Sequence, residues 1–222
     1  MNFLKKYNVI PKSIEPYTVA FTHASFSHEK NLSYNYERLE FLGDSVLDLV
    51  MSEFLYLKNP NYSEGDMSKL RSGYVCESAL VEYAKSIELS KFIKVGVGEE
   101  KEHGNEKKGI MADVFEALLG AIYIDLGFDT VKQFIYDVVM PFVDLEFTLE
   151  KVRDFKSELQ IKVQTDKKTI EYIVTKEDGP AHSKTFEVMV KIDDIVYGNA
   201  KAKTKREAEQ LAARSALEKE VY

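Results

Sequence analysis

The sequence is poor in the features that mark secreted and membrane proteins. Cys76 is its one cysteine among 222 residues, so no internal disulfide can form, and a reducing cytosol is the expected setting. We expect Cys76 to be a small buried apolar side chain. No run of about 18 apolar residues occurs, which predicts no membrane-spanning helix. The opening residues, MNFLKKYNVIPK, lack the apolar core of a signal peptide, so a cytoplasmic protein is predicted.

Two common ligand-binding signatures are also missing. The four histidines do not have the spacing of metal ligands, so a zinc site is not expected. Gly96 and Gly98 are too sparse to indicate a glycine-rich phosphate loop. We therefore expect no small-molecule cofactor.

Composition predicts a soluble globular chain of one or two domains, with 45% hydrophobic and 30% charged residues. The net charge of −7 argues at first sight against nucleic acid, but it is unevenly distributed. Residues 1–152 carry a net charge of −8, whereas residues 153–222 hold 14 Lys and Arg against 13 Asp and Glu. This shift predicts two domains, at 1–150 and 153–222.

The stretch from Glu37 to Val50, ERLEFLGDSVLDLV, reads as a helix with two unfavourable features. Its apolar positions form one stripe, as a buried helix requires: Leu39, Leu42, Val46, Leu49 and Val50. Carboxylates at i, i+3, i+7 and i+11 follow one face: Glu37, Glu40, Asp44 and Asp48. Like charges at this spacing repel, and Gly43 costs about 1 kcal/mol relative to alanine. A solvent-exposed helix face would explain the acidic row by itself. The charge repulsion and the glycine together indicate that these residues are there for a function and not for stability.

A second stretch, GIMADVFEALLGAIYIDLG from Gly109 to Gly127, is apolar almost all round and predicts a buried helix. Asp113 and Glu116 are its only acids before the terminal Asp125. Carboxylates in so apolar a helix are costly unless a positive charge neutralises them. No Lys or Arg occurs near them in the sequence, so that charge must come from elsewhere in the fold or from a cation. Two acidic pairs on two helices suit a hard divalent ion such as Mg²⁺.

The remaining pattern predicts an all-α N-terminal domain. Helices are expected over 2–7, 13–22, 36–57, 64–86, 109–127 and 129–150, with Ser63 as a cap and Pro141 as a kink. The polar stretches 23–36 and 99–108 are expected to be loops.

The C-terminal segment changes to a period of two and predicts a small α+β domain in the order α-β-β-β-α. A helix is expected over 154–164, followed by strands over 169–176, 184–192 and 195–200. Asp193-Asp194 is predicted to form a tight hairpin turn. Thr204 should cap the last helix, with Glu207 completing a capping box.

Basic residues crowd the start of that last helix: Lys201, Lys203, Lys205 and Arg206. The positive helix end adds to their charge, so the cluster predicts an anion site, with an ordinary solvated patch as the alternative. The loop Gly179-Pro180-Ala181-His182 presents an imidazole, which in the alternative interpretation is only an exposed loop histidine.

At this point the motifs resemble a known family. ERLEFLGDSVLDL is similar to the signature stretch of the ribonuclease III family, and GIMADVFEALLGAIYIDLG resembles its second acidic segment. The series DFKSELQ, GPAH and KTKREAEQLAA resembles a double-stranded-RNA-binding domain. Together these motifs cover almost the whole chain, in the arrangement of the small bacterial enzyme.

The resemblance implies an all-α, dimeric, Mg²⁺-dependent nuclease domain followed by an RNA-binding module, with Mn²⁺ as a substitute ion. The implied metal ligands are Glu40, Asp44, Asp113 and Glu116, of which Asp44 and Glu116 are expected to be catalytic. Glu37 and Glu64 match secondary acidic positions near the dimer interface and the RNA cleft. The implied RNA-binding residues are Ser157 and Gln160 in one minor groove, His182 in the next, and Lys203, Lys205 and Arg206 on phosphates.

Two departures from the family pattern are visible. Ala200-Lys201-Ala202 stands where many relatives have Gly-x-Gly, which should stiffen the approach to the last helix and keep its charge. Ser157 stands where threonine is frequent, which preserves the hydroxyl.

The residues and the resemblance together predict an endoribonuclease specific for double-stranded RNA. Two ions about 3.5–4 Å apart would activate a water and stabilise the leaving 3′ oxygen. Two centres in a dimer would cut both strands, which gives 5′-phosphate and 3′-hydroxyl ends with short 3′ overhangs. By resemblance, the substrates are ribosomal RNA precursors and structured messages. One alternative is a dimeric RNA-binding protein with a vestigial centre, but such a centre should have lost metal ligands, and all four are present here. A second alternative is an RNA chaperone, which would not explain the acidic residues in an apolar helix.

Overall fold

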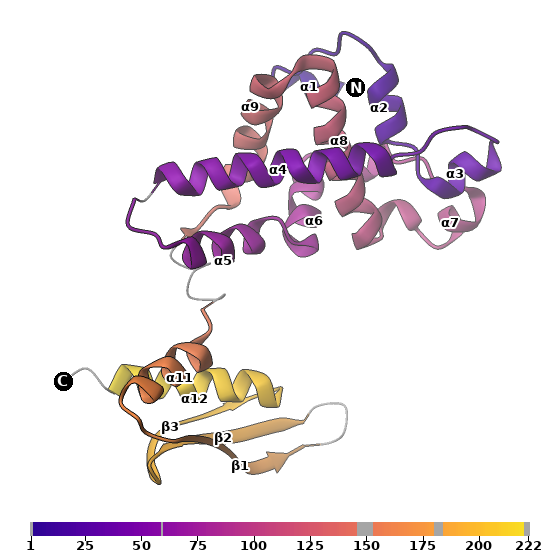
Figure 1. Ribbon diagram of the computed structural model, residues 1–222. Helices are drawn as coiled ribbons and strands as arrows, with labels where there is room; N and C mark the ends of the chain where they lie inside the picture. Colours follow the sequence, from indigo (N-terminus) through magenta and orange to yellow (C-terminus); the bar gives the residue numbers. More distant parts are fainter. Residues whose placement is uncertain (1, 59, 146–152, 180–183, 220–222) are drawn as a thin grey trace. The chain divides into compact units, whose positions relative to one another are not determined.

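The computed structural model describes residues 2–58, 60–145, 153–179 and 184–219, which belong to two compact units. The larger unit is Met1–Val152 and the smaller unit is Arg153–Tyr222. Figure 1 draws both, and each is described here by itself. Among the described residues, no helix has the length and hydropathy that crossing a membrane would require.

The larger unit is built from helices, which confirms the predicted all-α class. Its helices are α1 (Asn2–Lys5), α2 (Glu15–Ala20), α3 (Ala24–Glu29), α4 (Glu37–Lys58), α5 (Glu64–Tyr74), α6 (Glu77–Ser86), α7 (Val97–Lys101), α8 (Lys108–Leu126) and α9 (Phe128–Val139). The described residues of this unit also form short 3₁₀ turns: η1 (Leu89–Lys91) and η2 (Gly104–Glu106) lie between helices, and η3 (Met140–Phe142) follows α9.

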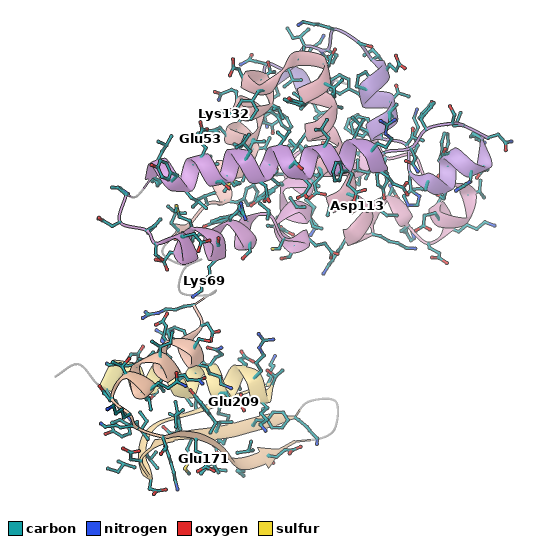
Figure 2. All side chains as sticks on the ribbon, in the orientation of Figure 1. Glu53, Lys69, Asp113, Lys132, Glu171 and Glu209 are labelled. Carbon is teal, nitrogen blue, oxygen red and sulfur yellow. The ribbon has the colours of Figure 1, made fainter. Side chains whose placement is uncertain are left out.

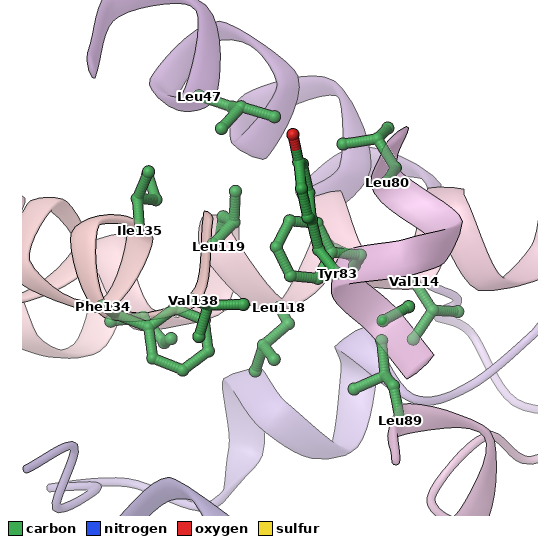
Figure 3. Close-up of a cluster of buried hydrophobic side chains, with 14 of the residues drawn as sticks. Leu47, Leu80, Tyr83, Leu89, Val114, Leu118, Leu119, Phe134, Ile135 and Val138 are labelled. Atoms are coloured by element: carbon green, nitrogen blue, oxygen red, sulfur yellow. The ribbon is translucent and has the colours of Figure 1, made fainter. Parts of the chain in front are cut away.

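Helix α8 runs through the core of this unit, as its apolar sequence predicts. α4, α6, α2 and α9 pack around it. In Figure 3 the buried side chains of α8 meet those of its neighbours, among them Leu47, Leu80, Tyr83, Leu118, Leu119, Phe134 and Ile135. A helix apolar on every side can be stable only when it is enclosed in this way.

Two glycines explain how closely α4 and α8 cross. A Cβ atom on Gly43 would lie 1.8 Å from the carbonyl oxygen of Glu116, and one on Gly120 would lie 2.3 Å from that of Leu39. Both distances are far below van der Waals contact, so the two backbones meet where side chains are missing. Close packing therefore accounts for a glycine at position 43, despite its low helix propensity. The low propensity does not need the functional explanation that the sequence alone suggests.

Several predicted element bounds are wrong. The helix expected over 64–86 is broken between α5 and α6, because Cys76 has an extended backbone at the N-cap of α6. Cys76 is exposed rather than buried. The stretch 23–36 contains α3, whose N-cap is His23, with the Nδ1 atom accepting a hydrogen bond from the Ser25 amide at 3.1 Å. Stretch 99–108 overlaps α7 and η2, and α9 ends at Val139, before Pro141.

The apolar stripe of α4 is only partly buried. Val46 and Val50 are buried and Leu39 is half-buried, as predicted for that stripe. Leu49 is instead 57% exposed, and Phe41 is 78% exposed on the same helix. α4 therefore has a second apolar face that the core of its own unit does not cover.

The smaller unit has the predicted α-β-β-β-α order. It consists of α11 (Phe155–Thr165), β1 (Ile170–Asp178), β2 (Thr185–Ile192), β3 (Ile195–Ala202) and α12 (Lys205–Lys219). The sheet is antiparallel in the order β1-β2-β3, and Asp193 and Asp194 have φ angles of 47° and 66° in the predicted hairpin turn.

Small side chains set the spacing between α12 and this sheet. Ala208, Ala212, Ala213 and Ala216 of α12 are buried against it. A Cβ atom on Gly198 of β3 would lie 2.2 Å from the Ala212 carbonyl oxygen, so glycine is needed there. As predicted, Thr204 caps α12, with its Oγ1 atom accepting from the Glu207 amide at 3.2 Å.

Candidate metal centre and nucleic-acid interface

The crossing of α4 and α8 brings the two predicted acidic pairs together. Gly43, in contact with the backbone of Glu116, is next in sequence to Asp44. Glu40 lies one helical turn before Asp44, and Asp113 lies one turn before Glu116, so the pairs face each other across the crossing. Figure 2 labels Asp113 on α8, beside α4.

The pKa values of Glu116 and Asp113 on α8 show how closely the negative charges are gathered. The pKa of Glu116 is raised to about 8, chiefly by burial and then by the charges of Asp44, Glu40 and Asp113, in that order of importance. Burial also raises the pKa of Asp113, which a hydrogen bond from Tyr36 partly opposes. A carboxyl that remains protonated near neutral pH lies in a site short of positive charge.

The α4 carboxyls respond in the same way. The pKa of Glu40 is raised to about 7, first by burial and then by the charges of Asp113, Glu37 and Asp44. Burial, followed by the charge of Asp48, raises the pKa of Asp44. Both helices therefore contribute carboxyls to one negatively charged cluster, in which each member penalises the ionisation of the others.

A divalent cation fits this cluster by donor type and charge. All four side chains offer carboxylate oxygens, the ligands that hard ions prefer. In the described part of the chain, however, no three acidic, histidine or cysteine side chains converge closely enough to enclose an ion. Binding must therefore turn these side chains toward a common point, which their mutual repulsion opposes until positive charge is present.

Arg71 of α5 provides part of the missing positive charge. Its Nη1 atom donates to Ser52 Oγ at 2.9 Å, and its Nε atom lies 3.8 Å from Asp48 Oδ1. The same guanidinium lowers the pKa of Asp44, against the burial and the Asp48 charge that raise it. No sequence signal pointed to Arg71, because α4 and α5 become neighbours only in the fold.

Tyr36 is a second residue that the sequence did not reveal. It directly precedes α4, is only 5% exposed, and donates a hydrogen bond from its hydroxyl to Asp113 Oδ2 at 2.9 Å. Its ring lies beside His23, with 5.6 Å between the ring centroids. An aromatic residue before a predicted helix reads as ordinary core, so this role appears only when α8 is in position.

The two secondary acidic residues, Glu37 and Glu64, have different surroundings in the structure. Glu37, the first residue of α4, is exposed but close enough for its charge to raise the pKa of Glu40. Glu64, the first residue of α5, accepts a hydrogen bond from Ser68 Oγ at 2.7 Å. Its charge does not appear among the causes of the pKa shifts of Glu40, Asp44, Asp113 or Glu116. Within one protomer, therefore, Glu37 joins the cluster and Glu64 does not.

An apolar surface lies along α4 on the side of Phe41. The exposed side chains are Phe41, Leu49 and Ile124. A hollow of about 840 Å³ has Ile124 in its wall, together with other apolar and several polar side chains. The apolar ones include Pro16, Val19, Leu39 and Leu42, and the polar ones include Glu15, His28 and Arg38. Exposed apolar side chains next to such a hollow are typical of a surface that another molecule covers.

In the smaller unit, the predicted RNA-binding residues are exposed on helices. Ser157 and Gln160 project from α11, and the Ser157 hydroxyl also donates to Asp154 Oδ2 at 2.8 Å. Lys203, Lys205 and Arg206 are exposed just before α12 and in its first turn, and none forms an ion pair with a described residue. His182 lies outside the described residues. Ala200 and Ala202 extend β3, pairing with Val188 and Phe186.

Comparisons with known proteins match both units. Residues 15–142 match the family model described as Ribonuclease-III-like, and residues 155–220 match the double-stranded RNA binding motif. Ribonuclease 3 of Streptococcus gordonii is 44% identical over 219 residues, which cover 97% of this chain and 94% of that protein. Ribonuclease 3 of Aster yellows witches'-broom phytoplasma is 45% identical over 213 residues, which cover 96% and 88% of the two chains.

Solved structures give the same result for the larger unit. A structure of the nuclease domain of ribonuclease III from Campylobacter jejuni, described as showing structural flexibility in a region involved in dimer formation, has a TM-score of 0.59 and 40% identity. The match covers 63% of this chain and 94% of that one.

Proposed function

The chain belongs to the ribonuclease III family, and on that premise we propose that the carboxylates of α4 and α8 form its divalent-metal centre. The protein is a double-stranded-RNA-specific endoribonuclease, with a nuclease domain followed by a double-stranded-RNA-binding motif. Nucleases of this family depend on divalent metal ions. We propose Mg²⁺ as the ion, with Mn²⁺ as a substitute, and domain bounds of 1–150 and 153–222.

The observation that carries the proposal is the cluster of carboxyls at the α4–α8 crossing. Glu40, Asp44, Asp113 and Glu116 would hold the ion, because each has a raised pKa and none forms an ion pair with a described residue. A bound divalent ion supplies Lewis-acid stabilisation of the charge that develops on a phosphodiester during hydrolysis.

The side chains of the cluster have three tasks in this proposal. Asp44 and Glu116, which lie at the crossing, would hold the ion where it could act on a phosphodiester. Glu40 and Asp113 complete the negative charge that makes the site selective for a cation over the RNA backbone. Arg71, whose Nε atom lies 3.8 Å from Asp48 Oδ1, would offset part of the negative charge that Asp48 adds to the cluster.

The smaller unit would hold the duplex without reading its sequence. A-form RNA offers 2′-hydroxyls and phosphates across a shallow minor groove, and its bases are poorly accessible. We propose that Ser157 and Gln160 of α11 contact one minor groove and that His182 contacts the next. Lys203, Lys205 and Arg206 would bind the phosphates between them, where the N-terminus of α12 adds positive potential. Since the substrate is RNA, we propose a cytoplasmic location, with ribosomal RNA precursors and structured messages as substrates.

We further propose that the apolar surface of α4 is the dimer interface. Phe41 is exposed on α4, and Ile124 is exposed in the wall of a hollow that Leu39 and Leu42 also line, which suits insertion of Phe41 into the hollow of a second copy. A symmetric dimer buries the same surface on both subunits. Two centres in one dimer would cut both strands and leave short 3′ overhangs, and Glu64 would then act near the partner's part of the RNA cleft.

Sedimentation tests the interface. The full chain should sediment as a dimer at micromolar concentration, and Phe41→Glu should make it a monomer because burying an unpaired carboxylate in the interface is costly. Tyr56→Glu is the control, since Tyr56 is 70% exposed on the same helix but lines a different hollow, together with Glu64 and Arg71. A Phe41→Glu variant that remains dimeric would place the interface elsewhere.

The test of the activity is cleavage of a long RNA duplex with and without Mg²⁺, with the products sized. The wild type should give short duplexes only with the metal. Asp125→Asn should cleave as well as the wild type, because Asp125 is a carboxylate of the same helix that accepts hydrogen bonds from the Lys12 and Ser13 amides, away from the cluster. Binding without cleavage in every metal tested would instead support a non-catalytic RNA-binding protein.

A further inference from the structure

We propose that Tyr36 is the positioning residue that orients Asp113 for metal binding, an inference that rests on the metal centre proposed above. The Tyr36 hydroxyl donates to Asp113 Oδ2 at 2.9 Å, and this side chain bond joins residues 77 positions apart. One carboxylate oxygen is thereby occupied and the other remains available to a cation. Groups that hold a ligand in this way keep it in the orientation that the metal requires.

The Tyr36 side chain is itself fixed by groups that do not belong to α8. Its amide donates to the Thr22 carbonyl oxygen at 3.0 Å, and its own carbonyl oxygen accepts from the Leu39 and Glu40 amides. The ring is buried beside His23. The hydroxyl therefore holds a fixed position relative to α4, and its bond to Asp113 sets the orientation of an α8 ligand from the α4 side of the site.

His23 is in turn held by the segment before α7. The His23 amide donates to the Lys94 carbonyl oxygen at 3.0 Å, and Thr22 forms an isolated bridge with Lys94. Ser25 Oγ, which lies 2.7 Å from His23 Nδ1, accepts from the Gly96 amide at 2.9 Å. These bonds connect α3 and α7 to the ring of Tyr36, which explains how elements without carboxylates in the cluster can influence the site.

The hydroxyl is a dependable donor. A tyrosine hydroxyl is a neutral donor at neutral pH, because its ordinary pKa is about 10. A neutral donor also leaves the negative charge on Asp113, where an arginine in the same place would neutralise it. This combination orients a metal ligand while preserving its affinity for a cation.

The same helix carries a matched pair that serves as a control. Tyr17 is fully buried, and its hydroxyl donates to Asp125 Oδ2 at 3.1 Å near the other end of α8. Asp125 is held there by backbone amides and lies outside the cluster. Tyr17→Phe and Tyr36→Phe thus remove the same chemical group from the same type of bond, at a structural site and at the proposed functional site.

The experiment measures Mn²⁺ binding by calorimetry in the absence of RNA, together with the Mg²⁺ dependence of cleavage. Tyr36→Phe should bind Mn²⁺ about 10–100-fold more weakly, as expected when a group supporting a metal ligand is lost. The Mg²⁺ concentration for half-maximal cleavage should rise by a similar factor, while kcat at saturating Mg²⁺ stays close to that of the wild type. Tyr17→Phe should leave both quantities unchanged, and melting curves of the two variants show that each is folded.

Asp113→Asn completes a double-mutant cycle. If Tyr36 acts through Asp113, adding Tyr36→Phe to Asp113→Asn should weaken Mn²⁺ binding no further. An additional loss as large as that in the wild-type background would overturn the proposal, as would wild-type Mn²⁺ binding by Tyr36→Phe. Glu116→Gln separates this outcome from a wrong metal centre: if Glu116→Gln also binds Mn²⁺ normally, the ion binds elsewhere and the proposed centre itself fails.

Discussion

Glu40 and Glu116 of the helical unit lie half-buried among charges of the same sign, whereas Lys203, Lys205 and Arg206 of the smaller unit project into solvent. The first arrangement costs stability, because burial and repulsion both disfavour ionised carboxylates. The second costs almost nothing, because exposed charges are solvated and screened. Substitutions should therefore affect the two units in opposite ways: removing a buried acid should stop the chemistry and stabilise the fold, and removing exposed bases should weaken binding and leave stability unchanged.

The largest effect should come from Glu116→Gln. This change removes the carboxylate with the pKa of about 8 and keeps its size, so we expect cleavage to fall by about 10³-fold while duplex binding survives. Asp44→Asn should behave likewise. Single-turnover cleavage and a filter-binding assay on the same preparation measure the two quantities. Cleavage at the wild-type rate by Glu116→Gln would remove this residue from the metal centre.

The next largest effect should come from Gly43→Ala, which changes no charge. The new Cβ atom would lie 1.8 Å from the Glu116 carbonyl oxygen, so α4 and α8 must move apart. Overpacking of this kind costs about 1–3 kcal/mol or more, and the separation should also reduce cleavage because the acidic pairs no longer meet. Denaturant unfolding and cleavage rates test both effects.

Gly109→Ala is the control for this change. Gly109 lies in α8, and a Cβ atom there would meet no atom within 4 Å. The substitution should be neutral or slightly stabilising, because alanine favours the helix. Equal losses for the two variants would mean that the close crossing is not what Gly43 provides.

These two predictions show which parts of the site the sequence could reveal. Asp113 and Glu116 were identifiable because acids in the apolar α8 violate a local rule, whereas the family resemblance selected Glu40 and Asp44 from the acidic row of α4. Gly43 violated a local rule as well, but its cause is a contact with Glu116, 73 positions away, that no local pattern contains. Tyr36 and Arg71 violate no rule at all, since a buried aromatic and a surface arginine are ordinary, and their partners on other helices give them their roles.

The fold shows the same limit. Periodicity predicted both fold classes and the hairpin at Asp193-Asp194, whose residue types favour the positive φ angles observed. It did not predict α3, because the N-cap of this helix is His23 and histidine is rarely found at that position. It also did not predict the break between α5 and α6 at Cys76. Neither position has a proline or glycine to mark it, so tertiary packing determines both.

A smaller effect is expected when Lys203, Lys205 and Arg206 are changed together to alanine. Each lost phosphate contact lowers the slope of log K against log salt by about 0.9 for a duplex, so the triple variant should lower it by about two to three. Binding should weaken alike for every duplex sequence, and cleavage should persist at low salt. The measurement uses Glu116→Gln with Ca²⁺ in place of Mg²⁺, across a salt series.

A variant with Lys167, Lys168 and Lys191 changed to alanine provides the control, because it removes the same charge from the segment after α11 and from β2. Its slope should equal that of the unmodified protein. If both triple variants lower the slope equally, the effect comes from net charge, and the start of α12 is not a specific phosphate site.

The smallest effect should be a pH-dependent gain in stability from Glu116→Gln in the absence of metal. The ordinary pKa of this carboxyl is 4.5, and burial together with the neighbouring carboxylates raises it to about 8, so between these values the folded protein keeps a proton that the unfolded chain has released. Stability therefore falls as pH rises through that interval, and the favourable contribution of the protonated group is fully present only below about pH 4.5. Glutamine cannot ionise, so the variant should melt at the wild-type temperature near pH 5 and a few degrees above it at pH 8 to 9.

Melting curves in EDTA measure the difference, and saturating Mg²⁺ should reverse its sign, because the ion stabilises only the protein that binds it. Glu53→Gln on α4 is the control, since Glu53 is ion-paired with Lys132 and its loss should lower the melting temperature instead. A Glu116→Gln advantage that stays constant with pH would mean that the cluster does not repel itself as described, and the contrast between the two units would lose its physical basis.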